Sequence, residues 1–228
     1  MFSRPTRTSI LQVIKDYKAI IPRKLKMSYR PWMRQKEIDI ILAILKGSNP
    51  KYCLEWGSGF SSLYFPQYLS NEAKWLALEH ETTWGNTVKG LNKRENVEIR
   101  VVTPDKNSWQ GDGNYEEFKS YIESPVGNKY DLIIIDGRAR MECVRKGKSL
   151  LSDKGVMILH DANREKYREV KGSMEHTALF TDHRRGYGGI WVGSKQPLTK
   201  VLDVDFYQNV WQSHDKLSSL FSIKASKK

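Results

Sequence analysis

The feature that most constrains the fold is the stretch KYCLEWGSGFSS at residues 51–62. A short β-prone apolar run ends here in an acid, Glu55, and the chain then enters a glycine-rich turn. Gly57 and Gly59 can adopt backbone angles that are closed to other residues, so a ligand can approach the main chain closely. The serines that close the stretch can cap the helix that follows. A strand, a glycine-rich turn and a helix in this order predict a loop that cradles a nucleotide.

The position of Glu55 indicates which nucleotide binds. In a dinucleotide-binding loop the helix N-terminus faces a pyrophosphate, and a carboxylate just before the first glycine would repel that anion. S-adenosylmethionine has no phosphate and carries an amino group and a sulfonium, so an acid at this position favours it. A purely structural turn after a strand is the alternative that this stretch leaves open.

The run Glu55-Trp-Gly57-Ser-Gly59 resembles the first motif of the class I S-adenosylmethionine-dependent methyltransferases, which reads acid-x-Gly-x-Gly. The resemblance covers about residues 48–194. It implies an α/β fold, a Rossmann-like three-layer sandwich with a seven-stranded, mostly parallel sheet whose last strand is antiparallel. It also implies that S-adenosyl-L-methionine is the cofactor. The loop residues that it places at the cofactor are Glu55, Gly57, Ser58, Gly59, Ser61 and Ser62.

Hydrophobic periodicity supports this fold along the rest of the chain. Apolar or alternating runs predict further strands at residues 75–79, 97–102, 129–136, 155–160, 176–180 and 189–193. Helical patterns lie at residues 31–46, 63–69, 115–122 and 164–174, and an amphipathic segment lies near residue 210. The run at 129–136 contains four consecutive apolar residues, 132–135, as is typical of a strand buried on both faces of a parallel sheet.

The second strand also ends in an acid, Glu79, about 20 residues beyond the glycines. A carboxylate at this place after a β-α-β unit can accept both ribose hydroxyls, and an ordinary strand-end acid is the alternative. The loop after the third strand contains Asp105 and Trp109, which we expect to give adenine a polar partner and a flat apolar wall. An aromatic lid over the core is the competing interpretation of Trp109.

Three polar residues follow the fourth and fifth strands and are the candidate catalytic groups, namely Asp136, His160 and Asp161. One of them can act as a general base for a hydroxyl acceptor, since methyl transfer from a sulfonium otherwise needs chiefly alignment. Alternatively, Asp136 and Asp161 hold a divalent cation that acidifies the hydroxyl. Metal-dependent catechol-type methyltransferases carry an Asp-Asn pair after the fifth strand. Ala162 stands where that Asn is expected and Asn163 is shifted by one, which weakens the metal hypothesis.

Three arginines leave the same edge of the sheet, Arg138, Arg140 and Arg164. Cations near a helix N-terminus oppose its dipole, so the first two are expected to be compensated by an anion. A carboxylate or phosphate on the acceptor suits the guanidinium fork. Tyr187, between the last two strands, is expected to line the same acceptor pocket, with a solvated hairpin turn as the alternative.

Composition adds a statement about partners. The formal net charge is +12, which favours an anionic partner such as nucleic acid, an acidic membrane surface or an acidic saccharide. Cys53 and Cys143 show no metal-ligand spacing and no secretory signal accompanies them, so two reduced thiols in a cytoplasmic protein are expected. The oligomeric state is left open.

The chain is expected to divide into a basic appendage at residues 1–30, a methyltransferase domain at 31–195 and an extension at 196–228 that ends in a disordered Lys/Ser tail. The appendage has apolar residues at helical spacing. It is expected either to pack over the domain or a partner subunit, or to lie on anionic lipid as a peripheral membrane contact.

The hypothesis that these features favour is an O-methyltransferase for an acidic saccharide or another anionic small molecule. An RNA or protein methyltransferase suits the net charge, but the amine-methylating Asn-Pro-Pro-Tyr type of motif is missing after the fourth strand and no RNA-binding module is recognisable. A nicotinamide-dinucleotide-binding Rossmann protein is disfavoured by Glu55 and by Ser62 in place of a third glycine. A non-catalytic nucleotide-binding protein of this fold remains the fourth possibility.

Overall fold

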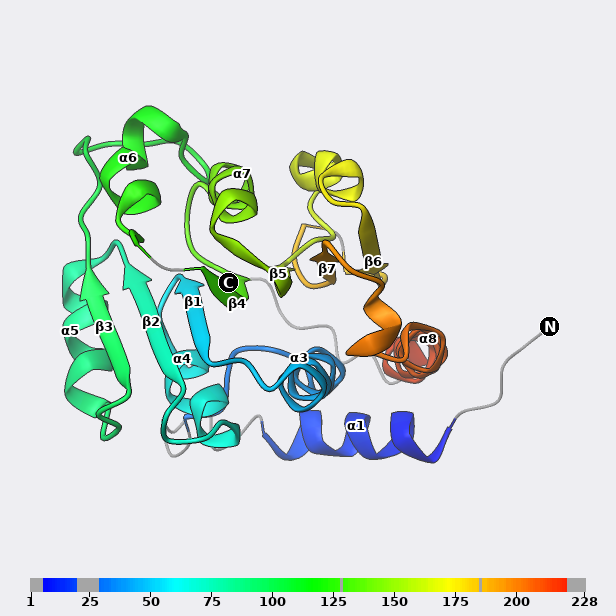
Figure 1. The fold of residues 1–228 in the computed structure, drawn as a ribbon. Coiled ribbons are helices and arrows are strands. Elements are labelled where there is room, and N and C mark those ends of the chain that lie inside the picture. Colours follow the sequence, from blue (N-terminus) through cyan, green and yellow to red (C-terminus); the bar gives the residue numbers. More distant parts are fainter. Residues whose placement is uncertain (1–5, 20–28, 128, 185, 221–228) are drawn as a thin grey trace.

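A seven-stranded sheet forms the centre of the molecule in the computed structural model, with strand order β3-β2-β1-β4-β5-β7-β6 (Figure 1). The structure describes residues 6–19, 29–127, 129–184 and 186–220. The strands are β1 (Tyr52–Trp56), β2 (Lys74–Glu79), β3 (Val97–Val101), β4 (Tyr130–Ile135), β5 (Leu151–His160), β6 (His176–Phe180) and β7 (Ile190–Ser194). Strands β1 to β5 pair in parallel, whereas β7 is antiparallel to both β5 and β6. The predicted fold class is confirmed.

Two hydrophobic cores lie on the two faces of the sheet, and β4 contributes to both. Leu132 and Ile134 point into one core, while Ile133 and Ile135 point into the other. All four side chains are fully buried. Because successive side chains of a strand point to opposite faces, the part of β4 that is covered by helices on both sides has no polar position, and this explains the apolar run at residues 132–135.

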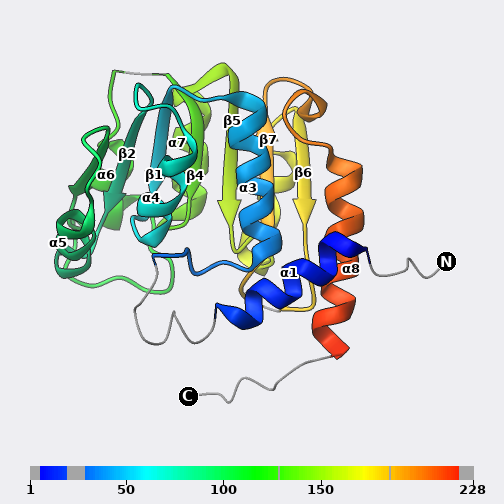
Figure 2. The same ribbon diagram turned by 90° about the horizontal axis from the view of Figure 1, so that it is seen from below.

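Helices cover both faces (Figures 1 and 2). One face carries α3 (Gln35–Ser48), α4 (Phe60–Tyr64), α5 (Thr82–Leu91) and α8 (Val204–Leu220). The opposite face carries α6 (Tyr115–Glu123), α7 (Arg140–Leu150) and the 3-10 helix η2 (Glu165–Gly172). Helix α1 (Arg7–Lys18) lies outside the sandwich, against α8 and α3. The Lys/Ser tail predicted to be disordered, residues 221–228, lies outside the described residues.

The helix before β1 differs from its predicted bounds. It begins at Gln35, because the Glu37 carboxylate accepts the backbone N–H of Arg34 at 2.6 Å and so satisfies the helix start. It continues through Gly47 and ends at Ser48, where Asn49 caps it with a left-handed φ of 43°. A Cβ on Gly47 would lie 2.5 Å from the Val201 carbonyl oxygen. This glycine therefore permits close packing and does not stop the helix.

Three other helical segments also differ from the prediction. The helix predicted over residues 63–69 is a short α4 followed by the 3-10 helix η1 (Phe65–Tyr68), because Pro66 cannot donate a helical hydrogen bond. The predicted helix at 164–174 is a 3-10 helix over Glu165–Gly172. Helix α5 was not predicted; the Glu81 carboxylate caps it by accepting the N–H groups of Thr83 and Trp84.

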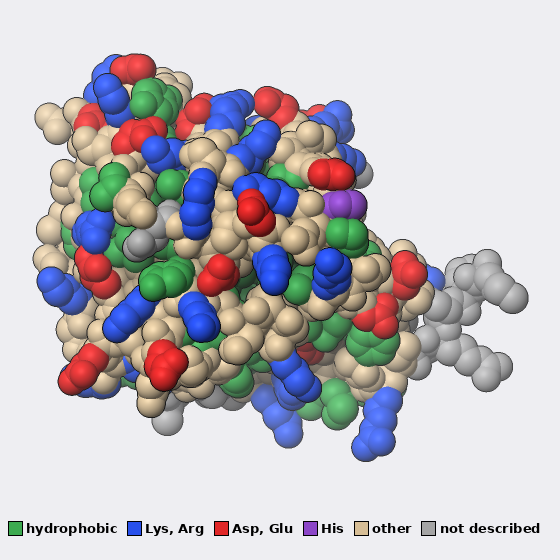
Figure 3. Space-filling view, in the orientation of Figure 1, with side chains coloured by type: hydrophobic (Ala, Val, Ile, Leu, Met, Phe, Trp, Pro, Cys, Tyr) green, Lys and Arg blue, Asp and Glu red, His purple; other side chains and the backbone are tan. Residues whose placement is uncertain are grey.

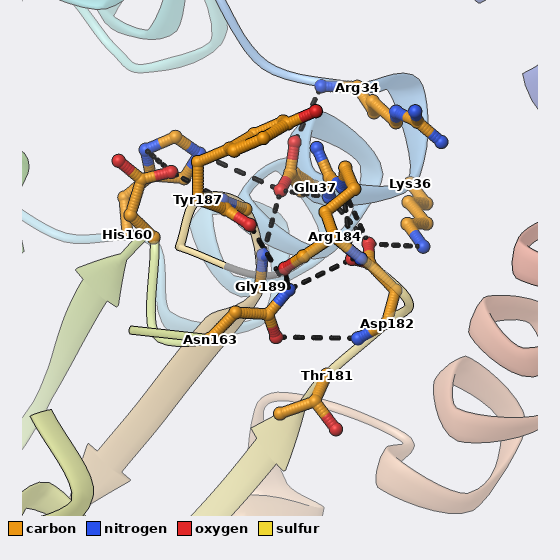
Figure 4. A network of polar contacts seen from close by, with 12 residues as sticks. Arg34, Lys36, Glu37, His160, Asn163, Thr181, Asp182, Arg184, Tyr187 and Gly189 are labelled. Carbon is orange, nitrogen blue, oxygen red and sulfur yellow. Dashed lines mark hydrogen bonds and ion pairs between the residues drawn. The ribbon is translucent and has the colours of Figure 1, made fainter. Parts of the chain in front are cut away.

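Buried ion pairs join α3 to the connection between β6 and β7 (Figure 4). The Lys36 ammonium lies 2.8 Å from Asp182, and both side chains are almost fully buried. Arg184 lies 2.6 Å from Asp182 and 2.8 Å from the Glu37 carboxylate. Asn163, after β5, donates to Asp182 at 2.9 Å. The connection is therefore fixed by charge as well as by packing, at the edge of the sheet where β5 ends.

We expect Asp182→Ala to lower the free energy of unfolding by about 3–5 kcal/mol at neutral pH, because it leaves buried cations uncompensated. Burial opposes the Asp182 charge, but Arg184 and Lys36 outweigh it and hold the pKa of Asp182 below its ordinary value. The stabilisation should therefore be present above the unfolded pKa of about 3.9 and be lost as pH falls toward the folded pKa. Urea denaturation at several pH values measures this.

Asp153→Ala is the matched control, because Asp153 makes a solvent-exposed ion pair with Lys195. Its effect should stay below about 1 kcal/mol. Equal losses for the two variants would contradict a structural role for the buried pairs.

Candidate active site

A cavity of about 420 Å³ opens where β1, β2, β4 and β5 reach their carboxyl ends. This is the place where open α/β sheets bind their ligands. Most of the residues predicted for the site line it, namely Gly57, Ser58, Gly59, Ser61, Glu79, Asp136, Arg138, Arg140, His160, Asp161 and Arg164. The structure therefore brings together groups from four separate strand ends, as the strand-end positions predicted.

The glycine turn after β1 is shaped by a backbone contact with the turn after β4. Gly57 has a φ of +101°, and a Cβ on it would lie 2.4 Å from the Gly137 nitrogen. Its N–H donates to the Leu78 carbonyl at 2.8 Å. Only glycine fits at position 57, and the main chain of Gly57, Ser58 and Gly59 is left open toward the cavity. The predicted close approach of backbone and ligand is thus sterically possible.

Glu55 does not face the cavity, contrary to the reasoning from its charge. Its fully buried carboxylate accepts the hydroxyls of Ser61 at 2.5 Å and Ser62 at 2.6 Å, and the Trp75 indole N–H at 3.0 Å. Burial raises the pKa of Glu55 to about 7. Glu55 and Ser62 therefore stabilise the loop from the side that faces away from the cavity. Any effect of Glu55 on a ligand is transmitted through the main chain.

Glu79 occupies the end of β2 as predicted and lines the cavity. One carboxylate oxygen accepts the backbone N–H groups of His80 at 2.9 Å and Glu81 at 3.0 Å, and the other accepts the Ser58 hydroxyl at 3.3 Å. These contacts fix the carboxylate beside the glycine loop. It stands where a ribose diol beside that loop can donate to it.

The predicted adenine-binding pair is not brought together. The Asp105 carboxylate accepts the backbone N–H and the hydroxyl of Ser120 in α6, and it does not line the cavity. Trp109 lines a neighbouring hollow of about 510 Å³. Its ring contacts those of Phe118 and His80, with centroid distances of 5.3 and 6.0 Å. His80 also lines the main cavity, so Trp109 contacts a residue of the cavity wall without lining the cavity itself.

Asp136, His160 and Asp161 form a compact cluster at the opposite side of the cavity, and two arginines bind it. His160 Nδ1 lies 2.9 Å from Asp136 Oδ1, and Arg140 contacts the same oxygen at 3.1 Å. Asp161 Oδ2 accepts Arg140 at 3.4 Å and Arg164 at 2.5 Å, while its other oxygen accepts a backbone N–H at 2.5 Å. Most charged groups of the cluster therefore pair with an opposite charge inside it.

Glu37 belongs to this cluster, although sequence reasoning missed it (Figure 4). Its carboxylate lies 3.7 Å from His160 Nε2. Burial disfavours the imidazolium, but Asp136 and Glu37 outweigh it and raise the pKa of His160 to about 10. Burial likewise opposes the Glu37 charge, yet His160 and Arg184 lower the pKa of Glu37 to about 2. A signal was present in the sequence, because Glu37 precedes Ile41 and Ile44 at helical spacing on the buried face of α3.

This arrangement does not suit a divalent cation. The candidate ligand atoms of Asp136, His160 and Asp161 lie within 4.8 Å of one another. A metal requires a neutral imidazole and free carboxylate lone pairs. Here cations already bind Asp136 Oδ1 and Asp161 Oδ2, and Asp161 Oδ1 accepts the Gly188 N–H, so among the described residues only Asp136 Oδ2 is left without a partner, and His160 adds a positive charge beside it. Asn163 points away, donating to Asp182 at 2.9 Å.

The arginines differ in whether a carboxylate of the chain already pairs with them. This corrects the expectation that an acceptor anion compensates both Arg138 and Arg140. Arg140 is buried and is compensated within the chain by Asp136 and Asp161. Arg138 donates to the Gly111 carbonyl at 3.3 Å, and no carboxylate among the described residues pairs with it. Arg164 is only partly exposed, and it pairs with Asp161.

Aromatic side chains complete the wall of the cavity and were not predicted as part of it. Trp32, which is 75% exposed, lies with Phe60 and Trp84 at centroid distances of 5.6 to 6.4 Å. All three line the cavity. Tyr187, by contrast, is exposed outside the lining residues, with its ring 5.9 Å from the Arg184 guanidinium carbon. The flat apolar surface at the mouth therefore comes from the segment before α3 and from α4 and α5.

No protein-family model matches the chain, and no curated protein matches its sequence. Solved structures do resemble it. A putative O-methyltransferase from Klebsiella pneumoniae is 13% identical with a TM-score of 0.54, over 82% of this chain and 89% of that one. An O-methyltransferase from Bacillus cereus in complex with S-adenosylhomocysteine is 16% identical with a TM-score of 0.52, over 82% and 90% of the two chains.

A third similar structure is the O-methyltransferase TomG from Streptomyces achromogenes, involved in tomaymycin synthesis and solved with S-adenosylmethionine. It is 13% identical with a TM-score of 0.51, over 84% of this chain and 91% of that one. At these identities the likeness establishes the architecture. The chain has the Rossmann-like fold of the class I S-adenosylmethionine-dependent methyltransferases.

We expect millimolar Mg²⁺ to leave the melting temperature of the wild-type protein unchanged relative to NaCl at equal ionic strength. Arg140→Gln combined with His160→Gln removes both cations that bind Asp136 Oδ1, so this double variant should gain a Mg²⁺-dependent rise of about 2–4 °C for each kcal/mol of binding. Thermal unfolding with and without a chelator measures both effects. Stabilisation of the wild type by Mg²⁺ would contradict the conclusion that its own cations fill the site.

Proposed function

We propose that the protein is an S-adenosylmethionine-dependent methyltransferase acting on an oxygen of an anionic small molecule or saccharide. One observation carries this proposal: the exposed backbone of Gly57 and Gly59 and the fixed Glu79 carboxylate line the same cavity. The glycine main chain suits the methionine portion of the cofactor, and Glu79 suits its ribose hydroxyls. The shared fold of methyltransferases solved with S-adenosylmethionine or its product supports this assignment.

The same cavity has a group that can take the acceptor's proton. Asp136 Oδ1 is bound by His160 and Arg140, whereas Oδ2 has no partner among the described residues and belongs to a lining side chain. We assign Oδ2 as the general base. As the acceptor oxygen attacks the methyl carbon, the carbon–sulfur bond breaks, the sulfonium becomes a neutral thioether, and the hydroxyl proton passes to Asp136.

His160 has a different role in this scheme from the one its sequence position suggested. As an imidazolium between Asp136 and Glu37 it has no free lone pair, so it positions the Asp136 carboxylate and balances its charge. Burial opposes the Asp136 charge, but His160 and Arg140 outweigh it and lower the pKa of Asp136. A weak base suffices here, because the leaving group is already activated. Asp161 anchors Arg140 and Arg164.

The walls of the cavity indicate the kind of acceptor. Arg138 has no carboxylate partner among the described residues and stands at the mouth, where it can bind an acceptor carboxylate or phosphate. Trp32 lines the same cavity with its large ring exposed. An acceptor with one anionic group and one flat, weakly polar ring face fits both. Hexuronic acid glycosides and hydroxybenzoates share this chemistry.

We expect S-adenosylhomocysteine at about a hundred times its dissociation constant to raise the melting temperature by about 5–10 °C, since native-state binding stabilises by mass action. NAD should have no effect. Glu79→Ala should remove most of the shift because the ribose loses its acceptor. Glu95→Ala, an exposed acid outside the cavity, should retain it. Stabilisation by NAD instead would remove the methyltransferase assignment.

We expect Arg138→Ala to raise the KM for an anionic acceptor about tenfold to a hundredfold, because a charged hydrogen bond is worth about 1.5–3 kcal/mol. Trp32→Ala should raise it about threefold to tenfold through lost ring contact. Neither should change the affinity for S-adenosylhomocysteine. Asp136→Asn should instead lower kcat. The assay is a methyl-transfer screen over hexuronic acid glycosides, hydroxybenzoates and neutral sugars.

Tyr52→Ala is the matched aromatic control, because Tyr52 is exposed at the start of β1 and does not line the cavity. It should leave all constants unchanged. A preference for neutral acceptors would eliminate the acidic-acceptor proposal. Equal loss of cofactor affinity in Arg138→Ala would assign that arginine to the cofactor site.

A further inference from the structure

Helix α1 packs against the domain through its polar face. Ser9 is fully buried, and its hydroxyl lies 2.8 Å from that of Ser213 in α8. Gln12 donates to Asp39 in α3 at 2.8 Å. A surface helix of a globular protein normally turns its apolar stripe inward. In α1 the side that meets α3 and α8 is held largely by hydrogen bonds.

Asp16, the one acid of α1, is part of this inward face. It accepts the backbone N–H of Gln35 at 2.7 Å and the His214 ring at 3.0 Å. Arg30 also donates to it, at 3.1 Å. The negative charge of the helix is therefore turned toward the domain and compensated there.

The opposite side of α1 is apolar and basic. Ile10, Leu11 and Ile14 are 44%, 48% and 43% exposed. With about 100° between successive residues of a helix, the basic side chains of the helix fall on the same arc. These are Arg7, Lys15 and Lys18. Figure 3 shows basic and hydrophobic side chains side by side along the lower edge of the molecule, where Figure 1 places α1.

We infer that this outward face of α1 binds an anionic lipid surface. Half-exposed aliphatic side chains next to basic residues, with no acid among them, are the composition of a helix that lies in a membrane interface. Each basic residue near an anionic leaflet contributes about 1 kcal/mol. No helix among the described residues is long and apolar enough to cross a bilayer. With 12 residues, α1 itself is shorter than the roughly 30 Å hydrocarbon core of a bilayer, so the contact that we infer is peripheral.

A second copy of the chain suits this face less well. A two-fold interface would bring the basic residues of one α1 against those of the other, without an acid on either outward arc to pair with them. The helix has 12 residues, and a helix of that length spans about 18 Å. A stable interface buries about 800 Å² on each partner, from 20 to 30 residues, which one such helix does not supply.

The contact has a consequence for the cavity. Arg30 binds Asp16 of α1 and also donates to Gln35 at the start of α3. The residues that follow it, Pro31, Trp32 and Met33, line the cavity. A lipid surface that holds α1 thus lies next to the segment that forms the aromatic wall of the site.

Co-sedimentation of the full chain with vesicles tests the inference. Binding is expected to vesicles containing phosphatidylserine and not to pure phosphatidylcholine, and to weaken with added salt. Leu11→Asn with Ile14→Asn should reduce binding about tenfold or more. Lys15→Glu should reduce it at least about fivefold. These side chains point outward, so the melting temperature and its shift with S-adenosylhomocysteine should stay at wild-type values.

Val126→Asn and Lys93→Glu are the matched controls, since both alter exposed residues away from α1 and should bind like the wild type. Equal affinity for the two kinds of vesicle would overturn the inference, as would equal losses in controls and α1 variants. A concentration-dependent dimer in analytical ultracentrifugation that Leu11→Asn dissociates would also overturn it, by assigning the face to a second copy. The test does not depend on methyl transfer.

Discussion

The compensation of buried charge at the carboxyl edge of the sheet is the constraint on which the rest of this structure depends. Glu37, Asp136 and Asp161 are set against His160, Arg140 and Arg164. Removing one member would strand a charge in low dielectric, at a cost of about 3–5 kcal/mol. The cluster therefore fixes α3, the two strand ends and the connection before β7 in a single arrangement. It also shapes one wall of the cavity.

The parts of the fold that could be predicted are those set by local pattern. The apolar run at residues 132–135 of β4 is visible in sequence because both faces of that strand are covered, and the acid at the end of β2 is visible because it closes an apolar run. Gly57 in the turn after β1 could also be predicted, since a backbone that passes 2.4 Å from where its Cβ would lie admits no other residue. Strand-end position was enough to place Glu79, Asp136 and Asp161 on one edge.

What could not be predicted is which groups pair. The sequence shows Arg138 and Arg140 as two similar cations, yet one is buried among carboxylates and the other stands at the cavity mouth. Glu55 has the motif position but is turned beneath the loop, because two serine hydroxyls and an indole lie there. These outcomes follow from tertiary contacts between segments far apart in the chain, and periodicity carries no information about them.

The ion pairs of this cluster also affect how the net charge of the protein is interpreted. The net charge of +12 counts histidine as neutral, so in that count the three carboxylates of the cluster outnumber its two arginines by one, and the cluster does not supply the positive excess. The excess of positive charge must lie on other surfaces, and of the three arginines that line the cavity only Arg138 has no carboxylate partner among the described residues. On α1 the single acid is turned inward while its basic residues remain on the outward arc. Most of the positive charge therefore lies outside the cavity, and part of it lies on the outward arc of α1.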